Sequence, residues 1–149
     1  MALLKGEVSY IFKDAEVKAA VVENAFLEKL PLDLGTLKDV VVLDEQPPEA
    51  NDLVRYHHWD AILEGQDDAE LYCEVQDRDP LQILYTSGTT SNPKGVLSSH
   101  LSVYLQALGT AYDLKFTDRD VAAAMLPLFH TAQLNAFTAP LIVAGGTPV

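Results

Sequence analysis

Two short runs of β-branched residues constrain the fold of this chain more than any other feature. Residues 18–23 read KAAVVE and residues 40–44 read VVVLD, a composition typical of short buried strands. Between them, Asn24 is placed to cap a helix that continues through Lys29 and is stopped by Pro31. A strand, a helix and a second strand in this order predict a βαβ unit.

The remainder of the chain continues the alternation of strands and helices. The expected elements are a short amphipathic helix at 55–63, a polar surface connection at 65–79, a strand at 81–86, a serine-capped helix at 99–112, a turn at 117–120, a strand at 121–126 and an apolar helix at 131–144 that two glycines end. This order predicts the α/β class, with a mostly parallel sheet and helices on its faces.

Length and charge limit the classes of function. The chain has 149 residues, which suits one domain, and a net charge of −12, which disfavours binding to nucleic acid. All of the net charge lies in residues 1–79, whereas residues 80–149 carry equal numbers of acidic and basic side chains. The second half is therefore free of a local acidic field that would repel an anionic ligand.

Other features predict a cytoplasmic protein without a membrane span. The single cysteine, Cys73, excludes an intrachain disulfide and suits a reducing compartment. The first ten residues lack the pattern of a signal peptide, and residues 126–149 are too often interrupted by polar residues, proline and glycine to cross a bilayer. We expect the adjacent His57 and His58 to be a surface pair at the start of a helix, and we expect no metal site.

One segment combines residue types that bind phosphate. Residues 86–95 read TSGTTSNPKG, with five hydroxyl side chains, two glycines and Lys94. Short donors, closely approaching backbone amides and a cation together fit phosphate oxygens. The segment is not the Walker A pattern, because Pro93 and Gly95 flank the lysine. The structural alternative is a hairpin turn rich in serine and threonine, made by Asn92 and Pro93.

The ordered run ILYTSGTTSNPKGV resembles the phosphate-binding signature of the AMP-forming adenylating superfamily, which includes acyl-CoA synthetases. Residues 95–100 (GVLSSH), 126–135 (LPLFHTAQLN) and 144–149 (AGGTPV) are similar to segments that follow the signature in acyl-CoA synthetases. The resemblance is strong from Gln82 onward and weak before it. It implies that residues 1–149 are one partial AMP-binding domain, with an acidic βαβ-like part at 1–79, a phosphate-loop part at 80–149 and no C-terminal domain.

The resemblance implies a fatty-acid–CoA ligase as the parent enzyme. Such an enzyme uses ATP and Mg²⁺ to join a carboxylic acid to AMP, and then transfers the acyl group to coenzyme A. The residues that match the loop holding the β- and γ-phosphates are Thr86, Ser87, Gly88, Thr89, Thr90 and Lys94. His130 matches a position near the acyl and adenylate pocket, where it gates or positions the substrate. A helix-capping role for His130 is an equal alternative.

Three functional readings stay open from the sequence. The first is a fragment of a fatty-acid–CoA ligase that is inactive by itself. The second is a stand-alone module that binds nucleotide or phosphate without catalysis, and the third is a non-functional gene remnant. A sheet cut at Val149 also predicts an unpaired strand edge and self-association of the chain.

Overall fold

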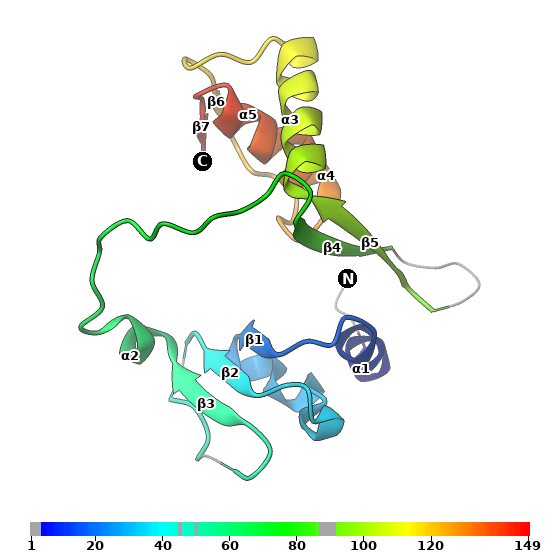
Figure 1. Ribbon diagram of the computed structural model, residues 1–149, viewed down its shortest axis with the longest axis vertical. Coiled ribbons are helices and arrows are strands. Elements are labelled where there is room, and N and C mark those ends of the chain that lie inside the picture. The colour runs from blue at the N-terminus through cyan, green and yellow to red at the C-terminus, as the bar shows by residue number, and fades with distance from the viewer. Residues whose placement is uncertain (1–3, 45, 50, 87–91) are drawn as a thin grey trace. The chain divides into compact units, whose positions relative to one another are not determined.

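The computed structural model describes residues 4–44, 46–49, 51–86 and 92–149, and the chain divides into two compact units. Residues 1–72 and 85–95 form unit 1, and residues 73–84 and 96–149 form unit 2 (Figure 1). No helix among the described residues is long and apolar enough to cross a membrane. The division into an acidic part and a phosphate-loop part of one domain stays a prediction.

Unit 1 is built on a parallel three-stranded sheet. Its strands are β1 (Ala19–Val22), β2 (Asp39–Val42) and β3 (Arg55–His58), in the order β1-β2-β3. Alternate residues of β2 point to one face, so Val40 and Val42 are fully buried. They form the core with Ala20, Leu30, Leu37 and Val54. The two strands predicted from β-branched runs are confirmed, as is their parallel pairing.

Short helices connect and flank this sheet. They are α1 (Lys5–Asp14), the 3-10 helices η1 (Asn24–Lys29) and η2 (Leu32–Leu34), and α2 (Trp59–Leu63). The sequence did not predict α1. The helix expected after Asn24 is a 3-10 helix, and Asn24 is its first residue rather than its cap. The backbone amide of Asn24 donates to Asp44 Oδ1 at 2.7 Å.

The predicted helix at 55–63 is wrong over its first half. Residues Arg55–His58 form β3, and only Trp59–Leu63 is helical. The apolar spacing that suggested a helix was outweighed by pairing with β2, which places Arg55 beside Asp39 and Tyr56 beside Val40. His57 and His58 therefore end a strand, and His58 is also the N-cap residue of α2, as expected for a position at the start of a helix.

Unit 2 contains the longest helix, α3 (His100–Leu114). Ser99 caps it, because its Oγ accepts a hydrogen bond from the Ser102 amide at 3.3 Å. Before it lie β4 (Pro80–Thr86) and β5 (Lys94–Ser99), which pair in a two-stranded sheet. Residues 80–84 and 96–99 of these strands belong to unit 2, and residues 85–86 and 94–95 belong to unit 1. The strand at 81–86 and the capped helix are confirmed, whereas β5 was not predicted. The connection at 65–79 is exposed throughout, as expected.

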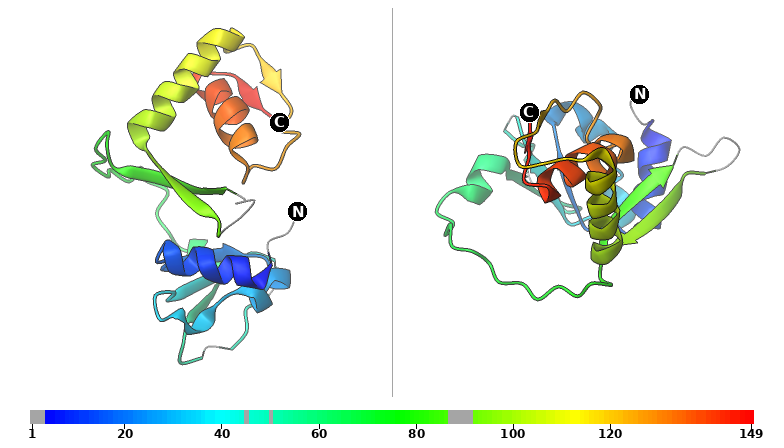
Figure 2. Two further views of the ribbon diagram at one scale, coloured as in Figure 1. Left: turned by 90° about the vertical axis from the view of Figure 1, so that its right-hand side faces the viewer. Right: turned by 90° about the horizontal axis from the view of Figure 1, so that it is seen from above.

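The last part of unit 2 packs against α3. It consists of β6 (Val121–Ala122), α4 (Thr131–Gln133), the π-helix η3 (Leu134–Thr138), α5 (Ala139–Val143) and β7 (Thr147–Pro148). Figures 1 and 2 show the helices from Thr131 to Val143 beside α3, where Ala107, Ala111, Pro140 and Leu141 are buried. β6 pairs in parallel with β7.

Two expectations for this segment need correction. The strand predicted at 121–126 ends at Ala122. The helix predicted at 131–144 is present from Thr131 to Val143, but it contains a π-helical segment before Pro140, which occupies the first turn of α5. Two aromatic side chains of this segment, Phe129 and Phe137, are 74% and 46% exposed.

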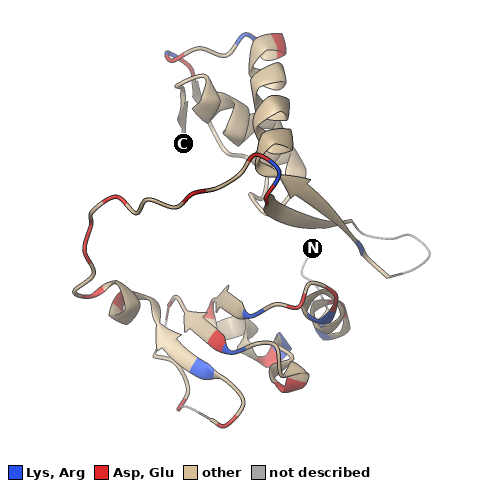
Figure 3. Ribbon diagram, viewed as in Figure 1, with Lys and Arg blue, Asp and Glu red and all other residues tan. Residues whose placement is uncertain are grey.

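The fold class is confirmed as mixed α/β, although the strands form three small sheets rather than one. One face of α3 is uncovered in unit 2, and it exposes Tyr104, Leu105, Leu108 and Tyr112. The predicted self-association stays a prediction. Figure 3 shows that acidic side chains are frequent before residue 80 and few after it, as the charge pattern requires.

Candidate functional site

The structure brings the two ends of the predicted phosphate loop together. Thr86 is the last residue of β4 and Lys94 is the first residue of β5. The hydroxyl of Thr86 donates to the carbonyl oxygen of Lys94 at 3.4 Å. The remaining candidates, Ser87, Gly88, Thr89 and Thr90, lie outside the described residues. The paired strands β4 and β5 thus form the base of the segment, and the phosphate interpretation and the hairpin alternative both stay predictions.

The cation of this segment is available to a ligand. Lys94 is exposed, and no carboxylate in the described part of the chain forms an ion pair with its ammonium group. The exposed ammonium group of Lys94 supplies one positive charge, whereas the hydrogen of the Thr86 hydroxyl is directed to the Lys94 carbonyl oxygen. An exposed positive charge suits phosphate oxygens, which carry negative charge.

A partly buried tyrosine precedes the loop, and it bonds to an exposed carboxylate. Tyr85 donates its phenolic hydrogen to Asp14 Oδ2 at 2.6 Å. Burial, the hydrogen bond to Asp14 and the charge of Asp14 together raise the pKa of Tyr85 to about 12, so its hydroxyl is protonated at neutral pH. The separation of 71 positions between the two partners explains why no local pattern revealed the bond.

His130 caps a helix in unit 2. Its Nδ1 accepts a hydrogen bond from the backbone amide of Ala132 at 3.1 Å, at the start of α4. This contact confirms the helix-capping alternative. It requires an unprotonated Nδ1, so the proton of the neutral ring is on Nε2. The exposed side chain leaves room for a second, ligand-directed role, which stays a prediction.

A cavity of about 310 Å³ lies beside α4 within unit 2. Most of its lining side chains are polar, and they come from β4, β5, α3 and α4 with the start of η3. They are Gln82, Ser98, Ser102, Gln106, Thr131 and Asn135, together with Val103, Ala132 and Ala136. Among the described residues, Gln82 Nε2 is a buried side-chain nitrogen without a hydrogen-bond partner.

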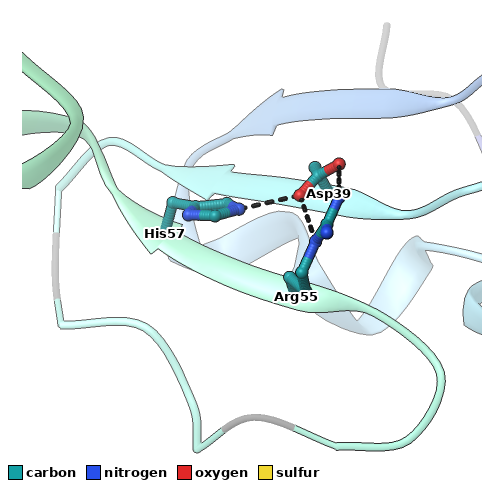
Figure 4. Close-up of polar contacts among 3 residues, drawn as sticks. All are labelled: Asp39, Arg55 and His57. Carbon is teal, nitrogen blue, oxygen red and sulfur yellow. Dashed lines mark hydrogen bonds and ion pairs between the residues drawn. The ribbon is translucent and has the colours of Figure 1, made fainter.

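A polar cluster lies on the sheet of unit 1 (Figure 4). Arg55 binds both carboxylate oxygens of Asp39 at 2.8 and 2.9 Å, and His57 Nε2 lies 2.8 Å from Asp39 Oδ1. The hydrogen bond from Arg55, and then that from His57, lower the pKa of Asp39 to about 2. Since the three groups satisfy one another, this cluster fits a cross-strand structural role. The described residues contain no cluster that could hold a metal ion.

Comparison with known proteins gives a consistent result. The family model for AMP-binding enzymes matches residues 2–149. The medium-chain-fatty-acid–CoA ligase of Ectopseudomonas oleovorans is 32% identical over 147 residues, which cover 93% of this chain and 26% of that protein. The 4-coumarate–CoA ligase 1 of Narcissus pseudonarcissus is 34% identical over 127 residues, covering 82% of this chain and 22% of that protein.

Solved structures show the same similarity. An anthranilate CoA ligase in complex with anthranoyl-AMP matches with a TM-score of 0.87 and 25% identity, over 97% of this chain and 28% of that one. ATP-bound MatB from Rhodopseudomonas palustris has a TM-score of 0.76 and 24% identity over 99% of this chain and 28% of that one, which shows a shared fold. The chain thus spans about a quarter of the length of these relatives.

Proposed function

This chain belongs to the AMP-binding enzyme family, and from that premise we propose that it is the phosphate-binding part of an ATP-dependent carboxylic acid–CoA ligase. The observation that carries the proposal is the ordered segment at residues 86–95, whose two ends meet where Thr86 bonds to Lys94. Similarity to several named CoA ligases supports coenzyme A as the acceptor of the acyl group.

The proposed reaction has two steps. A carboxylate oxygen of the acid attacks the α-phosphorus of ATP, and the bond to the bridging oxygen breaks, which releases pyrophosphate and leaves an acyl-adenylate. The thiol of coenzyme A then attacks the acyl carbon, loses its proton and displaces AMP. Negative charge accumulates on the departing pyrophosphate in the first step. A cation and hydroxyl donors around that group lower the barrier by electrostatic stabilisation.

The residues of the loop have different roles in this stabilisation of the phosphates. Lys94 offsets charge on the β- and γ-phosphates, and Thr86, Ser87, Gly88, Thr89 and Thr90 supply hydroxyl or backbone donors. We propose that Mg²⁺ takes part together with ATP. The ion neutralises phosphate charge when it is bound.

We propose that His130 is the catalytic residue contributed by unit 2, in a gating or positioning role. The backbone amide of Ala132 fixes the ring through Nδ1, so Nε2–H is a neutral donor of fixed direction. A neutral donor of this kind can orient a carboxylate or phosphate oxygen without transferring a proton. If His130 acts only as a helix cap, a substitution of His130 that preserves the helix would leave the activity unchanged.

The proposed acid is a fatty acid. The similarity to a medium-chain-fatty-acid–CoA ligase covers 93% of this chain and supports this choice. A 4-coumarate–CoA ligase of slightly higher identity covers 82% and favours an aryl acid as the second candidate. Assays with octanoate, palmitate and 4-coumarate separate the two classes.

The decisive experiment compares Lys94→Ala with Lys38→Ala in the complete protein that contains this sequence. Both lysines are exposed, but only Lys94 belongs to the loop. We expect Lys94→Ala to lower acid-dependent ATP–pyrophosphate exchange by about 100- to 1,000-fold, and Lys38→Ala to leave it unchanged. Equal exchange rates in the two variants would refute the assignment of the loop to phosphate binding.

A further inference from the structure

The hydrogen bond between Tyr85 and Asp14 links the start of the phosphate loop to a distant helix of unit 1. Tyr85 stands immediately before Thr86, which begins the candidate segment. Its hydroxyl lies 2.6 Å from Asp14 Oδ2, and its ring is partly buried. A short bond from a neutral donor to a carboxylate is among the stronger hydrogen bonds in proteins.

Asp14 is itself held in place. It is the last residue of α1, and the next residue, Ala15, donates its amide to the carbonyl oxygens of Ile11 and Lys13. On either side of it, Phe12 and Val17 pack against the core of unit 1, and the Val17 amide donates to the Phe12 carbonyl oxygen at 3.0 Å. The carboxylate that receives the Tyr85 bond is therefore carried by a segment that the core fixes.

A continuous series of contacts leads from this segment to the proposed phosphate ligands. Asp14 accepts from Tyr85, Tyr85 is covalently joined to Thr86, and Thr86 donates to the carbonyl oxygen of Lys94. The Tyr85 end of the loop is thus restrained by Asp14, and Thr86 connects it to the Lys94 end through the contact at 3.4 Å. A loop that is restrained before its ligand arrives loses less conformational entropy when the ligand binds.

We propose that Asp14 and Tyr85 form a positioning pair that holds the base of the phosphate loop in its ATP-binding geometry. This inference rests on the proposed function, and it assigns no contact with substrate to either residue. Removal of the bond leaves Lys94 and the hydroxyl donors in the chain but gives them more freedom. The cost therefore falls on ATP binding, and the affinity for the acid is unaffected.

The test uses Tyr85→Phe in the complete protein, with Tyr112→Phe as the matched control. Tyr112 lies on α3 and is 83% exposed, so its hydroxyl is expected to contribute little. We expect Tyr85→Phe to raise the KM for ATP about tenfold, with the KM for the acid and for coenzyme A unchanged. An unchanged KM for ATP, or an equal rise for all three substrates, would overturn the pair as a positioning device.

A second variant tests the partnership. Asp14→Ala removes the oxygens that accept the Tyr85 hydrogen bond, and we expect it to raise the KM for ATP as Tyr85→Phe does. The double variant is expected to be no worse than either single variant, because both remove the same bond. Effects that multiply in the double variant would show that the two residues act separately, which contradicts the proposal.

A spectroscopic readout checks the bond without activity. In an alkaline titration followed by phenolate absorbance, we expect one tyrosine to ionise later than the others, near pH 12. We expect this late ionisation step to be missing in Tyr85→Phe. If Tyr85→Phe still shows the late-titrating tyrosine, the bond between Tyr85 and Asp14 is refuted.

The Lys94→Ala variant distinguishes failure of the positioning pair from failure of the proposed function. If Lys94→Ala lowers ATP–pyrophosphate exchange and Tyr85→Phe does not change the KM for ATP, only the positioning pair fails. If Lys94→Ala has no effect, the proposed function fails.

Discussion

The stability of unit 1 depends on a very small core, and Leu37→Ala tests this dependence. The Leu37 side chain is fully buried and packs with Val40, Val42 and Leu30. The substitution removes three carbon atoms, which costs about 0.8 kcal/mol each in transfer free energy. The cavity that is left adds to this, so the expected loss is about 3 kcal/mol in the free energy of unfolding.

That loss is large for a unit of this size. Domains are stabilised by about 0.05–0.15 kcal/mol per residue, which gives about 4–12 kcal/mol for the roughly 80 residues of unit 1. With a urea m-value of about 1 kcal/mol/M for so small a unit, the transition midpoint falls by about 3 M. Leu37→Ala is therefore expected to remove between a quarter and three quarters of the stability of the unit.

Urea unfolding followed by tryptophan fluorescence measures the effect. Trp59 is the single tryptophan of the chain and lies in α2 of unit 1, so its emission reports on this unit. The matched control is Leu71→Ala, because Leu71 is 93% exposed and its removal leaves no cavity. Equal midpoints for Leu37→Ala and Leu71→Ala would refute the assignment of the core.

Three further predictions concern local features. Gly146→Ala places a Cβ atom 2.9 Å from the Asp120 carbonyl oxygen and is expected to destabilise unit 2 by about 1–3 kcal/mol, whereas the same change at Gly109, which meets nothing within 4 Å, stabilises α3 by about 0.5–1 kcal/mol in thermal unfolding. Ser99→Ala removes the cap of α3 and lowers its stability by about 1 kcal/mol, visible as faster amide hydrogen exchange in its first turn. The pKa of Asp39 is lowered to about 2, so its contribution to stability is complete above about pH 4 and is lost as the pH falls through 2. Carboxyl titration by NMR should find that Arg55→Ala returns this pKa toward 3.8, and an unchanged pKa would exclude the ion pair as its main cause.

The sequence predicted those elements whose pattern is local and strong. β1 and β2 follow from β-branched runs, and α3 follows from its apolar period and its serine cap. α1 was missed because its apolar residues do not cluster and none of its residues is buried. β3 was predicted as a helix because its identity depends on pairing with β2, which no pattern within Arg55–His58 records.

The candidate site likewise contains features that the local sequence reveals and one feature that only the tertiary structure reveals. The residue types of the loop suggest phosphate chemistry without any knowledge of the fold, since hydroxyls, glycines and a lysine in that order have few structural uses. The hydrogen bond between Tyr85 and Asp14 joins residues 71 positions apart and has no sequence signal. Local sequence therefore identifies the chemistry of the loop, and tertiary structure identifies what holds it.

Because Asp14 pairs with Tyr85 and not with Lys94, the positive charge of Lys94 is not neutralised by this carboxylate. Asp14 is an acidic residue of an acidic half-chain, and a carboxylate next to a phosphate loop could instead have paired with Lys94. Such a pair would neutralise the cation that phosphate needs. The carboxylate instead accepts a hydrogen bond from neutral Tyr85, and no ion pair among the described residues involves Lys94. The restraint on the loop is thus obtained from a neutral donor, which leaves the ammonium group of Lys94 for an anionic ligand.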